Sequence, residues 1–288
     1  MSEILHNLKK GAFLGAAKRI LVYCMPVSLV GRIRAKRIQR AIQQFPARVV
    51  EHLYGGNPLR IYLSDALSQG WYDHDWDELP ELSELKKHKL RAGARVFDVG
   101  AHQGVVAAML ALAVGSEGHV IAVEANSHNS QTAARNRELN GLSQLEIVEA
   151  AISNTTEPLY FNENLNGQIA GGEEYGKRLV KAVTLDGLAK RFGMPDVVFL
   201  DVEGAEYLAL LGASEVLRSN ADFFIEVHVG CGLERLDGSV EKIMRHFPLD
   251  RYNILARSNH ENNFRVIHEN DPITQERFFL LALHRDNV

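Results

Sequence analysis

Cysteine is nearly absent from this sequence. The 288 residues include only two, Cys24 and Cys231, which lie far apart and match no metal-ligand spacing. We therefore expect neither a disulfide framework nor a cysteine-based zinc site. We expect the protein to reside in a reducing, cytoplasmic compartment. The hydrophobic content of 46% and the charged content of 24% are ordinary for a globular protein, and the length suits one large α/β domain with an appendage.

A hydrophobic run long enough to span a membrane is also lacking. The longest apolar run, Ile20 to Val30, is interrupted by Pro26 and Ser28, whereas a spanning helix needs about 20 predominantly apolar residues. No small-residue cleavage site of the signal-peptide kind is evident either. The sequence therefore predicts no integral membrane segment.

Acidic residues are scarce near the N-terminus. Residues 1–48 contain ten Lys and Arg but one acid, Glu3, so this part carries +9 and, within a net charge of −4, the remainder carries −13. Residues 1–45 have a basic, helical pattern with two open interpretations. They contact anionic lipid at the inner membrane surface, or they pack on their own domain or on a partner. Nucleic acid is not an expected partner, because the body is acidic and lacks interleaved aromatic and basic residues.

The pattern divides the chain into three regions. Residues 1–47 form a basic helical extension, residues 48–92 a hairpin and helix subdomain, and residues 93–288 the main domain. Alternation around Gly55-Gly56 predicts a hairpin over Arg48–Asp65, and Glu78–Leu90 has the pattern of an amphipathic helix. The only two tryptophans, Trp71 and Trp76, either line a pocket or pack this subdomain against the main sheet.

From Arg95 onward, apolar strands alternate with helices. The predicted strands are Arg95–Asp98, His119–Glu124, Leu145–Glu149, Val197–Val202, Asp222–His228, Tyr252–Arg257 and Glu276–His284. The predicted helices are Gln103–Val114, Asn129–Asn140, Leu185–Phe192, Ala205–Leu217 and Ser239–His246. This alternation predicts an α/β fold with a mostly parallel seven-stranded sheet, helices on both faces and an antiparallel last strand. Asn162–Gly176, rich in Asn and Gly, is predicted to be a long mobile loop.

The stretch from Arg95 to Gly104 resembles the entry to a nucleotide site. An apolar strand ends at Asp98, Gly100 and Gly104 follow, and an apolar helical run comes next. Glycines let the backbone approach a ligand, and a helix N-terminus offers unpaired N–H groups. The third glycine of the dinucleotide fingerprint is missing, and the stretch is not a phosphate loop.

The acids at the strand ends favour one cofactor over another. Asp98 lies beside the glycine turn, and Glu124 follows Gly104 by 20 residues, where a carboxylate suits ribose hydroxyls. Asp98 would repel the pyrophosphate of a nicotinamide dinucleotide. S-adenosylmethionine carries a sulfonium and an ammonium instead, which acids attract. The predicted cofactor-binding residues are Asp98, Gly100, His102, Gly104, Glu124, Asn126, Glu149 and Asp201.

At this point the sequence resembles a known family. The string from Val96 to Gly104 is similar to the first motif of Rossmann-like S-adenosylmethionine-dependent methyltransferases, and three further strings resemble the FkbM family: VTLD at Val183, LDVEGAE at Leu200 and GA at Gly212. The resemblance implies an O-methyltransferase acting on a hydroxyl of a sugar or glycosylated metabolite. The family often has Asn, Pro and Lys where this chain has His102, Ala125 and Phe199. The last difference removes a cation beside the reaction site.

Methyl transfer to a hydroxyl also requires that the hydroxyl proton be removed. The predicted catalytic residues are Asp201, Glu226 and His228, which end neighbouring strands. These three could hold a divalent ion such as Mg²⁺, which resembles the metal-dependent catechol-type methyltransferases, or His228 could act directly as a general base. Glu203 and Glu206 could instead cap the following helix.

Two functions therefore remain open from sequence. The first is an S-adenosylmethionine-dependent O-methyltransferase with a small-molecule or glycan acceptor. The second is a catalytically silent relative that binds a membrane or an assembly through its basic extension, which the missing lysine and the charge of +9 suggest.

Overall fold

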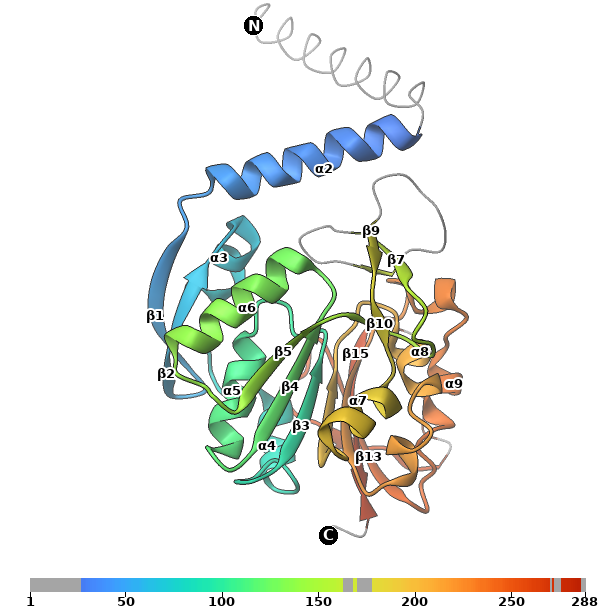
Figure 1. Cartoon of the computed structure of the whole chain (residues 1–288). Helices are drawn as coiled ribbons and strands as arrows, with labels where there is room; N and C mark the ends of the chain where they lie inside the picture. The colour runs from blue at the N-terminus through green and yellow to red at the C-terminus, as the bar shows by residue number, and fades with distance from the viewer. Residues whose placement is uncertain (1–26, 163–167, 170–177, 270, 272–275, 286–288) are drawn as a thin grey trace, which may run out of the picture.

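The computed structural model describes residues 27–162, 168–169, 178–269, 271 and 276–285. Within them the predicted α/β fold is confirmed: a mostly parallel sheet lies between helices (Figure 1). The strands of this sheet are β3 (Arg95–Val99), β4 (His119–Glu124), β5 (Leu145–Glu149), β11 (Val197–Leu200), β12 (Asp222–Val227), β13 (Tyr252–Ser258), β14 (Arg265–Val266) and β15 (Phe278–His284).

The strand order is β14-β13-β15-β12-β11-β3-β4-β5. The strands from β12 to β5 are mutually parallel, and β15 runs antiparallel to both β12 and β13, as predicted for the last strand. The two-residue strand β14 extends the predicted seven strands to eight. Because the order runs outward from β3 in one direction and from β11 in the other, it reverses between them. Ligands of such sheets bind at this point, beyond the carboxyl ends of the strands.

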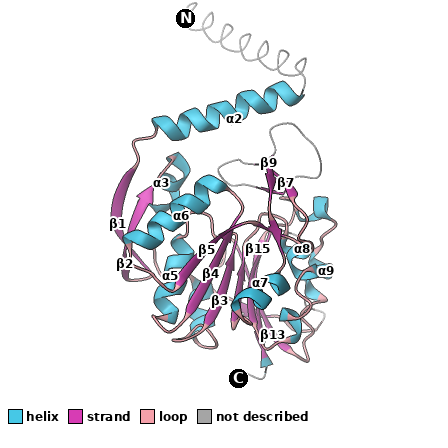
Figure 2. Cartoon of the chain, viewed as in Figure 1, coloured by secondary structure: helices cyan, strands magenta, loops and turns pink. Residues whose placement is uncertain are grey.

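Two layers of helices cover the sheet. The helices of the described residues are α2 (Val27–Gln44), α3 (Ala66–Tyr72), α4 (Pro80–Lys86), α5 (Val105–Val114), α6 (Ser127–Leu139), α7 (Leu185–Phe192), α8 (Glu206–Leu211) and α9 (Val240–Met244). Alternate strand residues point to opposite faces, so Val96 packs with α5 and Phe97 with α7 and α8. Figure 2 shows α5 and α6 on one side of the strands and α7 to α9 on the other. Burial on both faces explains why the central residues of these strands are mostly apolar instead of alternating with polar ones.

The predicted hairpin is present as β1 (Arg48–Tyr54) and β2 (Asn57–Leu63). Its two-residue turn, Gly55-Gly56, has φ angles of +58° and +78°, the left-handed backbone that such a turn requires. The alternate residues of β2, Leu59, Ile61 and Leu63, are fully buried in the hydrophobic cluster that also contains residues of α5. The hairpin therefore shares a core with the main sheet.

The predicted helix Ala205–Leu217 is instead two pieces, α8 and a 3₁₀ turn over Val216–Arg218. A Cβ at Gly212 would lie 2.5 Å from the Ser153 carbonyl oxygen, so the chain passes too closely for a regular helix to continue. The Asp186 carboxylate accepts the N–H groups of Glu215 and Val216 at 2.9 and 3.0 Å, which stabilises the second piece separately.

Five short strands lie outside the predicted set. They are β6 (Ala151–Ile152), β7 (Leu159–Asn162), β8 (Gln168–Ile169), β9 (Arg178–Val180) and β10 (Ala182–Val183). Strands β8, β7 and β9 form one small sheet, and β10 and β6 form another. The predicted loop Asn162–Gly176 lies outside the described residues except at its first residue and in β8.

Helix α2 precedes the hairpin and carries five Lys and Arg and no acid. In Figure 1 it lies beyond α3 and α6 at the N-terminal end of the described chain. Among the described residues, the helices are all too short or too polar to cross a membrane. The predicted contact of residues 1–45 with anionic lipid stays a prediction, since residues 1–26 are outside the description.

Candidate functional site

A cavity of about 300 Å³ opens at the carboxyl ends of β3, β4 and β11, where the strand order reverses. The turn after β3 and the ends of β4 and β11 form its floor. Trp71, Tyr72 and Trp76, from α3 and the segment after it, line it, as do Phe161 and Ile169 from the small inserted sheet. Both tryptophans therefore line a pocket, and Trp76 also packs edge-on against Tyr54 of the hairpin at 5.5 Å.

The two glycines after β3 permit close packing around this cavity. Gly100 has a φ of +92°, and a Cβ there would lie 1.6 Å from the Asp201 carbonyl oxygen. Gly104, with a φ of +77°, begins α5, and a Cβ there would lie 2.9 Å from the Ala133 Cβ. Only a residue without a side chain fits either position. Gly100 thus holds the ends of β3 and β11 together at the floor of the cavity.

His102 connects the glycine turn to two other elements. Its backbone has a φ of +48°, which is unusual for a residue with a side chain, and its N–H donates to Glu124 Oε2 at 2.9 Å. Its ring Nδ1 lies 2.8 Å from the Tyr72 hydroxyl, and its ring centroid lies 5.1 Å from that of Trp71. His102 therefore fixes the turn against both Glu124 and the aromatic wall.

Glu124 and Asp98 are two buried carboxyl groups that line the cavity. Glu124 Oε1 accepts the Asn126 N–H at 2.7 Å. Burial raises the pKa of Glu124 to about 7 despite its backbone hydrogen bonds. Burial, together with the negative charge of Glu124, likewise raises the pKa of Asp98 to about 7. Asp98 Oδ2 has no hydrogen-bond partner within the part of the chain that is described. A buried, unsatisfied carboxylate oxygen at a cavity wall is suited to a positively charged ligand group.

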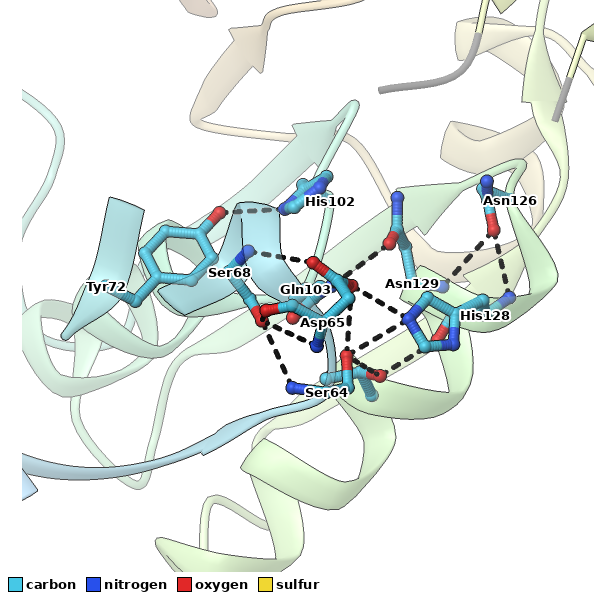
Figure 3. Close-up of polar contacts among 10 residues, drawn as sticks. Ser64, Asp65, Ser68, Tyr72, His102, Gln103, Asn126, His128 and Asn129 are labelled. Atoms are coloured by element: carbon cyan, nitrogen blue, oxygen red, sulfur yellow. Dashed lines mark hydrogen bonds and ion pairs between the residues drawn. The ribbon is translucent and has the colours of Figure 1, made fainter. Parts of the chain in front are cut away.

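A polar network holds α3 and its aromatic residues against the main domain (Figure 3). Asp65 caps α3 by accepting the Ser68 N–H at 2.8 Å, and its Oδ2 accepts from Gln103 Nε2 at 2.7 Å and lies 2.8 Å from His128 Nε2. Burial alone would raise the pKa of Asp65, but these hydrogen bonds hold it well below its usual range. Because Gln103 and His128 belong to the glycine turn and to α6, the network links the subdomain to the cavity.

A second polar cluster surrounds His228, which follows β12 and is completely buried. His228 Nδ1 lies 2.7 Å from Glu206 Oε1, which also accepts the Gly204 N–H at 2.9 Å. On the other side of the ring, Nε2 lies 3.6 Å from carboxylate oxygens of both Asp201 and Glu203. Asp201 and Glu203 line the cavity, so this cluster and the two buried carboxyl groups of Asp98 and Glu124 share one pocket.

Charges within the cluster shift its pKa values. Burial alone would lower the pKa of His228, but the hydrogen bond to Glu206 and the charges of Glu206, Asp201 and Glu203 raise it to about 9. Burial, and then the charge of Glu226, raise the pKa of Asp201 well above its usual range. His228 is therefore protonated at neutral pH when no cation is bound, and the Asp201 carboxyl group holds its proton more tightly than an ordinary aspartate does.

The backbone bends sharply to aim Glu203 at this cluster. Glu203 has a φ of +50° and Gly204 one of +100°, and a Cβ at Gly204 would lie 2.6 Å from the Gly232 carbonyl carbon. A left-handed backbone at a residue with a side chain costs about 1–3 kcal/mol and is concentrated at functional sites. The VEGAE part of the sequence thus encodes a bend as well as acids.

Glu226 and Phe199 lie in different surroundings, one beside a cation and the other in an aromatic stack. Glu226 forms an ion pair with Arg277, which lines the cavity, and its nearest carboxylate oxygen lies 3.8 Å from His228 Nε2. Phe199 also lines the cavity, and its ring stacks on Phe224 with centroids 4.1 Å apart. Positive charge therefore reaches this cavity from Arg277, just ahead of β15, rather than from β11.

The structure gathers half of the predicted site residues around the cavity and leaves the rest behind or outside it. Those that line it are Asp98, Gly100, His102, Glu124 and Asp201. Gly104 begins α5, and the Asn126 side chain caps α6 by accepting the His128 N–H at 3.0 Å. Glu226 and His228 lie behind Asp201.

Glu149 is not brought to the cavity. Its carboxylate is exposed and lies 3.3 Å from Ser127 Oγ and 3.5 Å from Arg178 Nη2. The next three residues, Ala150 to Ile152, line the cavity in its place. Alternation explains the change from Glu149 to Ala150 at the end of β5, and Ala151 and Ile152 follow in the separate strand β6.

Sequence reasoning missed Tyr72, Phe161, Ile169 and Arg277 as lining residues. Tyr72 lies between the two tryptophans, so the aromatic clustering was a signal that could have included it. The other three carried no signal in the sequence. Phe161 and Ile169 come from the inserted sheet, and Arg277 from the segment before the last strand.

Comparisons with known proteins agree with this architecture. Residues 98–252 match the family model described as "Methyltransferase FkbM domain", and residues 36–153 match the one described as "Protein-L-isoaspartate(D-aspartate) O-methyltransferase". A "Probable cobalt-precorrin-6B C(15)-methyltransferase (decarboxylating)" of Sulfolobus acidocaldarius is 30% identical over 100 residues, which are 35% of this chain and 51% of the relative. The chain thus matches about half the length of that curated relative.

Similar solved structures share little sequence with this chain. A methyltransferase FkbM from Methylobacillus flagellatus is 18% identical with a TM-score of 0.43, over 66% of this chain and 43% of that one. An O-methyltransferase from Bacillus cereus, solved in complex with SAH, is 16% identical with a TM-score of 0.41, over 70% of this chain and 78% of that one.

Proposed function

Because the chain belongs to the FkbM methyltransferase domain family and is an S-adenosylmethionine-dependent methyltransferase, we propose that it methylates a hydroxyl group of a sugar or a glycosylated small molecule. One observation carries the proposal. A single cavity contains two buried carboxyl groups suited to a cationic cofactor, two further carboxylates, Asp201 and Glu203, that can take a proton, and an aromatic wall. These are the parts that methyl transfer to a hydroxyl requires.

The cavity fits the cofactor. When bound, S-adenosylmethionine supplies a methyl group on a positively charged sulfur. Asp98 Oδ2, which is buried and lacks a partner among the described residues, would accept the cofactor's ammonium group. Glu124 would accept a ribose hydroxyl, because a carboxylate has about four acceptor positions and the backbone N–H groups of His102, Ala125 and Asn126 use three of them.

The remaining part of the cofactor would meet apolar surface. Ala150, Ala151 and Ile152 form one side of this part of the cavity, with Phe161 and Ile169 from the inserted sheet also lining it. A flat adenine ring packs well among such side chains. By contrast, the pyrophosphate of a dinucleotide would meet the negative charges of Asp98 and Glu124.

The carboxylates of Asp201 and Glu203 would receive the proton of the acceptor hydroxyl. Both line the cavity, and a carboxylate within reach of the acceptor hydroxyl can act as its general base. His228 is unsuited to act directly as the general base, because with a pKa of about 9 its ring already carries a proton at neutral pH. Its charge instead offsets the negative charges of the acids around it.

The aromatic wall supports a carbohydrate acceptor. Trp71 is 40% exposed, and Trp76 Nε1 donates to the Trp71 carbonyl at 3.0 Å, so the two tryptophans hold each other in place. The C–H face of a sugar ring is apolar and packs on a flat indole, while its hydroxyl groups reach polar neighbours. Glu203 and Arg277 line the same cavity and can meet those hydroxyls.

Mass spectrometry of cell-surface and secreted glycans, with and without the protein, tests the acceptor class. We expect at least one glycan to lose a single methyl group when the protein is removed. Restoring the wild-type chain should return that methyl group. Unchanged glycans, with a methyl group lost instead from a molecule that contains no sugar, would contradict the carbohydrate assignment.

Cofactor affinity should depend on pH, because the Asp98 carboxyl group must be ionised to accept the ammonium group of the cofactor. With a pKa of about 7 for Asp98 in the free protein, raising the pH from 6 to 8 should increase the association constant for S-adenosylhomocysteine about tenfold. Asp98→Asn should weaken binding about tenfold at pH 8 and flatten this dependence. Isothermal titration calorimetry across the pH range measures both effects.

The matched control is Asp250→Asn, the same chemical change at an exposed position in the turn before β13. It should leave the affinity and its pH dependence unaltered. A pH-independent affinity for wild type, or equal affinities for wild type and Asp98→Asn at pH 8, would count against the role assigned to Asp98.

A further inference from the structure

Three side chains of the His228 cluster converge on one point. Ligand atoms of Asp201, Glu203 and His228 all lie within 4.8 Å of one another, and His228 Nε2 lies 3.6 Å from both carboxylate oxygens. Two ligand atoms bound to one Mg²⁺ or Mn²⁺ ion at about 2.1 Å are about 3.0 Å apart at a right angle and about 4.2 Å apart when opposite. The two separations from His228 Nε2 fall between these limits, and the two carboxylate oxygens lie within 4.8 Å of each other, so a small movement lets one cation reach all three.

Two of these atoms are buried and unsatisfied. His228 Nε2, on a side chain with no exposed surface, and Asp201 Oδ1 have no hydrogen-bond partner in the described part of the chain. Leaving such atoms without a hydrogen bond is unfavourable, and at 3.6 Å they are too far apart to form one with each other. Both belong to the cluster beside the cavity, which is where a bound cation would satisfy them.

Glu206 orients the histidine in the way that metal sites do. Its carboxylate, itself fully buried, lies 2.7 Å from His228 Nδ1 and is fixed by the Gly204 N–H. A carboxylate on one ring nitrogen directs the other nitrogen toward a metal and makes it a better ligand, and a cation that binds there displaces the proton that Nε2 carries in the free protein. A histidine that served only as a counter-ion for Asp201 would not need this second, buried acid.

Glu226, which the sequence suggested as a ligand, is engaged elsewhere. Its ion pair with Arg277 directs its carboxylate to a guanidinium. Glu203 is aimed at His228 by its left-handed backbone instead. The geometry therefore selects Glu203 over Glu226 as the third ligand.

We infer that Asp201, Glu203 and His228 bind a divalent cation at the wall of the cavity, with Glu206 as the residue that positions His228. The two carboxylates suit Mn²⁺ or Mg²⁺, and the imidazole favours Mn²⁺ of the two. Three protein ligands leave coordination positions open to the cavity. A hydroxyl that enters one of these positions loses its proton more readily. This catalytic role rests on the proposed function, but the binding of the cation is independent of it.

Titration of the full chain with Mn²⁺, followed by the electron paramagnetic resonance signal of free Mn²⁺, tests the site directly. We expect one saturable site per chain, from which Mg²⁺ displaces Mn²⁺. Asp201→Asn and Glu203→Gln should each weaken binding at least tenfold, and Glu206→Gln should weaken it about 10- to 100-fold. Glu241→Gln, on the exposed surface of α9, is the matched control and should bind as wild type does.

Circular dichroism verifies that each variant is folded. Glu203→Gln is the deciding variant, because Glu203 is partly exposed and its replacement disturbs the core least. The absence of saturable Mn²⁺ binding would overturn the inference, as would unaltered binding by folded Glu203→Gln. A loss in Glu226→Gln without a loss in Glu203→Gln would also overturn it, in favour of the other ligand set.

Calorimetry with S-adenosylhomocysteine on the same samples separates this inference from the proposed function. If the chain binds S-adenosylhomocysteine but does not bind Mn²⁺, the metal site is overturned and the proposed function is not. Binding of Mn²⁺ without S-adenosylhomocysteine would support the metal site and contradict the assigned cofactor pocket.

Discussion

Asp201→Asn is expected to lower kcat by about 10²–10⁴-fold, the usual contribution of a positioned acid or base. Asparagine has the shape of aspartate but cannot accept the hydroxyl proton, and it is a poorer ligand for a cation. Because Asp201 touches Gly100 through its backbone rather than its carboxylate, the affinity for S-adenosylhomocysteine should stay within about threefold of wild type. The loss therefore belongs to kcat and not to cofactor binding.

The measurement is the transfer of labelled methyl groups from S-adenosylmethionine to the glycan fraction that the mass-spectrometric comparison identifies. Asp250→Asn again serves as the matched control and should retain wild-type kcat. Full activity of Asp201→Asn would remove Asp201 from the reaction. A parallel loss of cofactor affinity would instead indicate that the substitution disturbs the floor of the cavity.

Gly100→Ala is expected to destabilise the protein by about 3–5 kcal/mol, in the upper range for single substitutions. A Cβ at this position would lie 1.6 Å from the Asp201 carbonyl oxygen, so β3 and β11 would have to separate at their carboxyl ends. The Asp201 N–H donates to the Val99 carbonyl at 2.9 Å, and this hydrogen bond would be strained as well. Any folded fraction should bind S-adenosylhomocysteine weakly, because the turn beside Asp98 must move.

Gly93→Ala separates the collision from backbone strain. Gly93 also has a left-handed backbone, with a φ of +84°, but a Cβ there would meet no atom within 4 Å. Strain alone should cost about 1–2 kcal/mol. Urea denaturation followed by tryptophan fluorescence gives both free energies of unfolding. If the two variants were equally stable, the close approach of Gly100 to Asp201 would have no energetic consequence.

The fold was predictable because its strands carry strong local signals. Val197 to Leu200 and Phe223 to Ile225 are apolar because both sheet faces are covered, and each run itself predicts burial. Asp98 and Glu124 were likewise identifiable, because each directly ends a strand whose carboxyl end meets the ligand crevice. Local pattern and functional position coincide at these residues.

Other parts of the site depend on contacts between distant segments. Tyr72 reaches the cavity through a hydrogen bond to His102, 30 residues later. Arg277 forms an ion pair with Glu226, 51 residues earlier in the chain. It brings a positive charge to the cavity, where the position at which the family often has Lys is occupied by Phe199. No short motif records such pairings. The orientation of Glu203 depends on a left-handed backbone, which the adjacent Gly204 made possible but did not specify.

The hydrogen bonds of Asp65 to Gln103 and His128 have a practical consequence for anyone who shortens this chain. A recombinant fragment that starts at the first strand of the main sheet would lose one wall of its own ligand pocket. It would also lose Leu59, Ile61 and Leu63 and so expose the apolar surface that they cover. The smallest fragment worth crystallising with ligands therefore begins ahead of Arg48, so that it includes the hairpin, α3 and the contacts of Asp65 with Gln103 and His128.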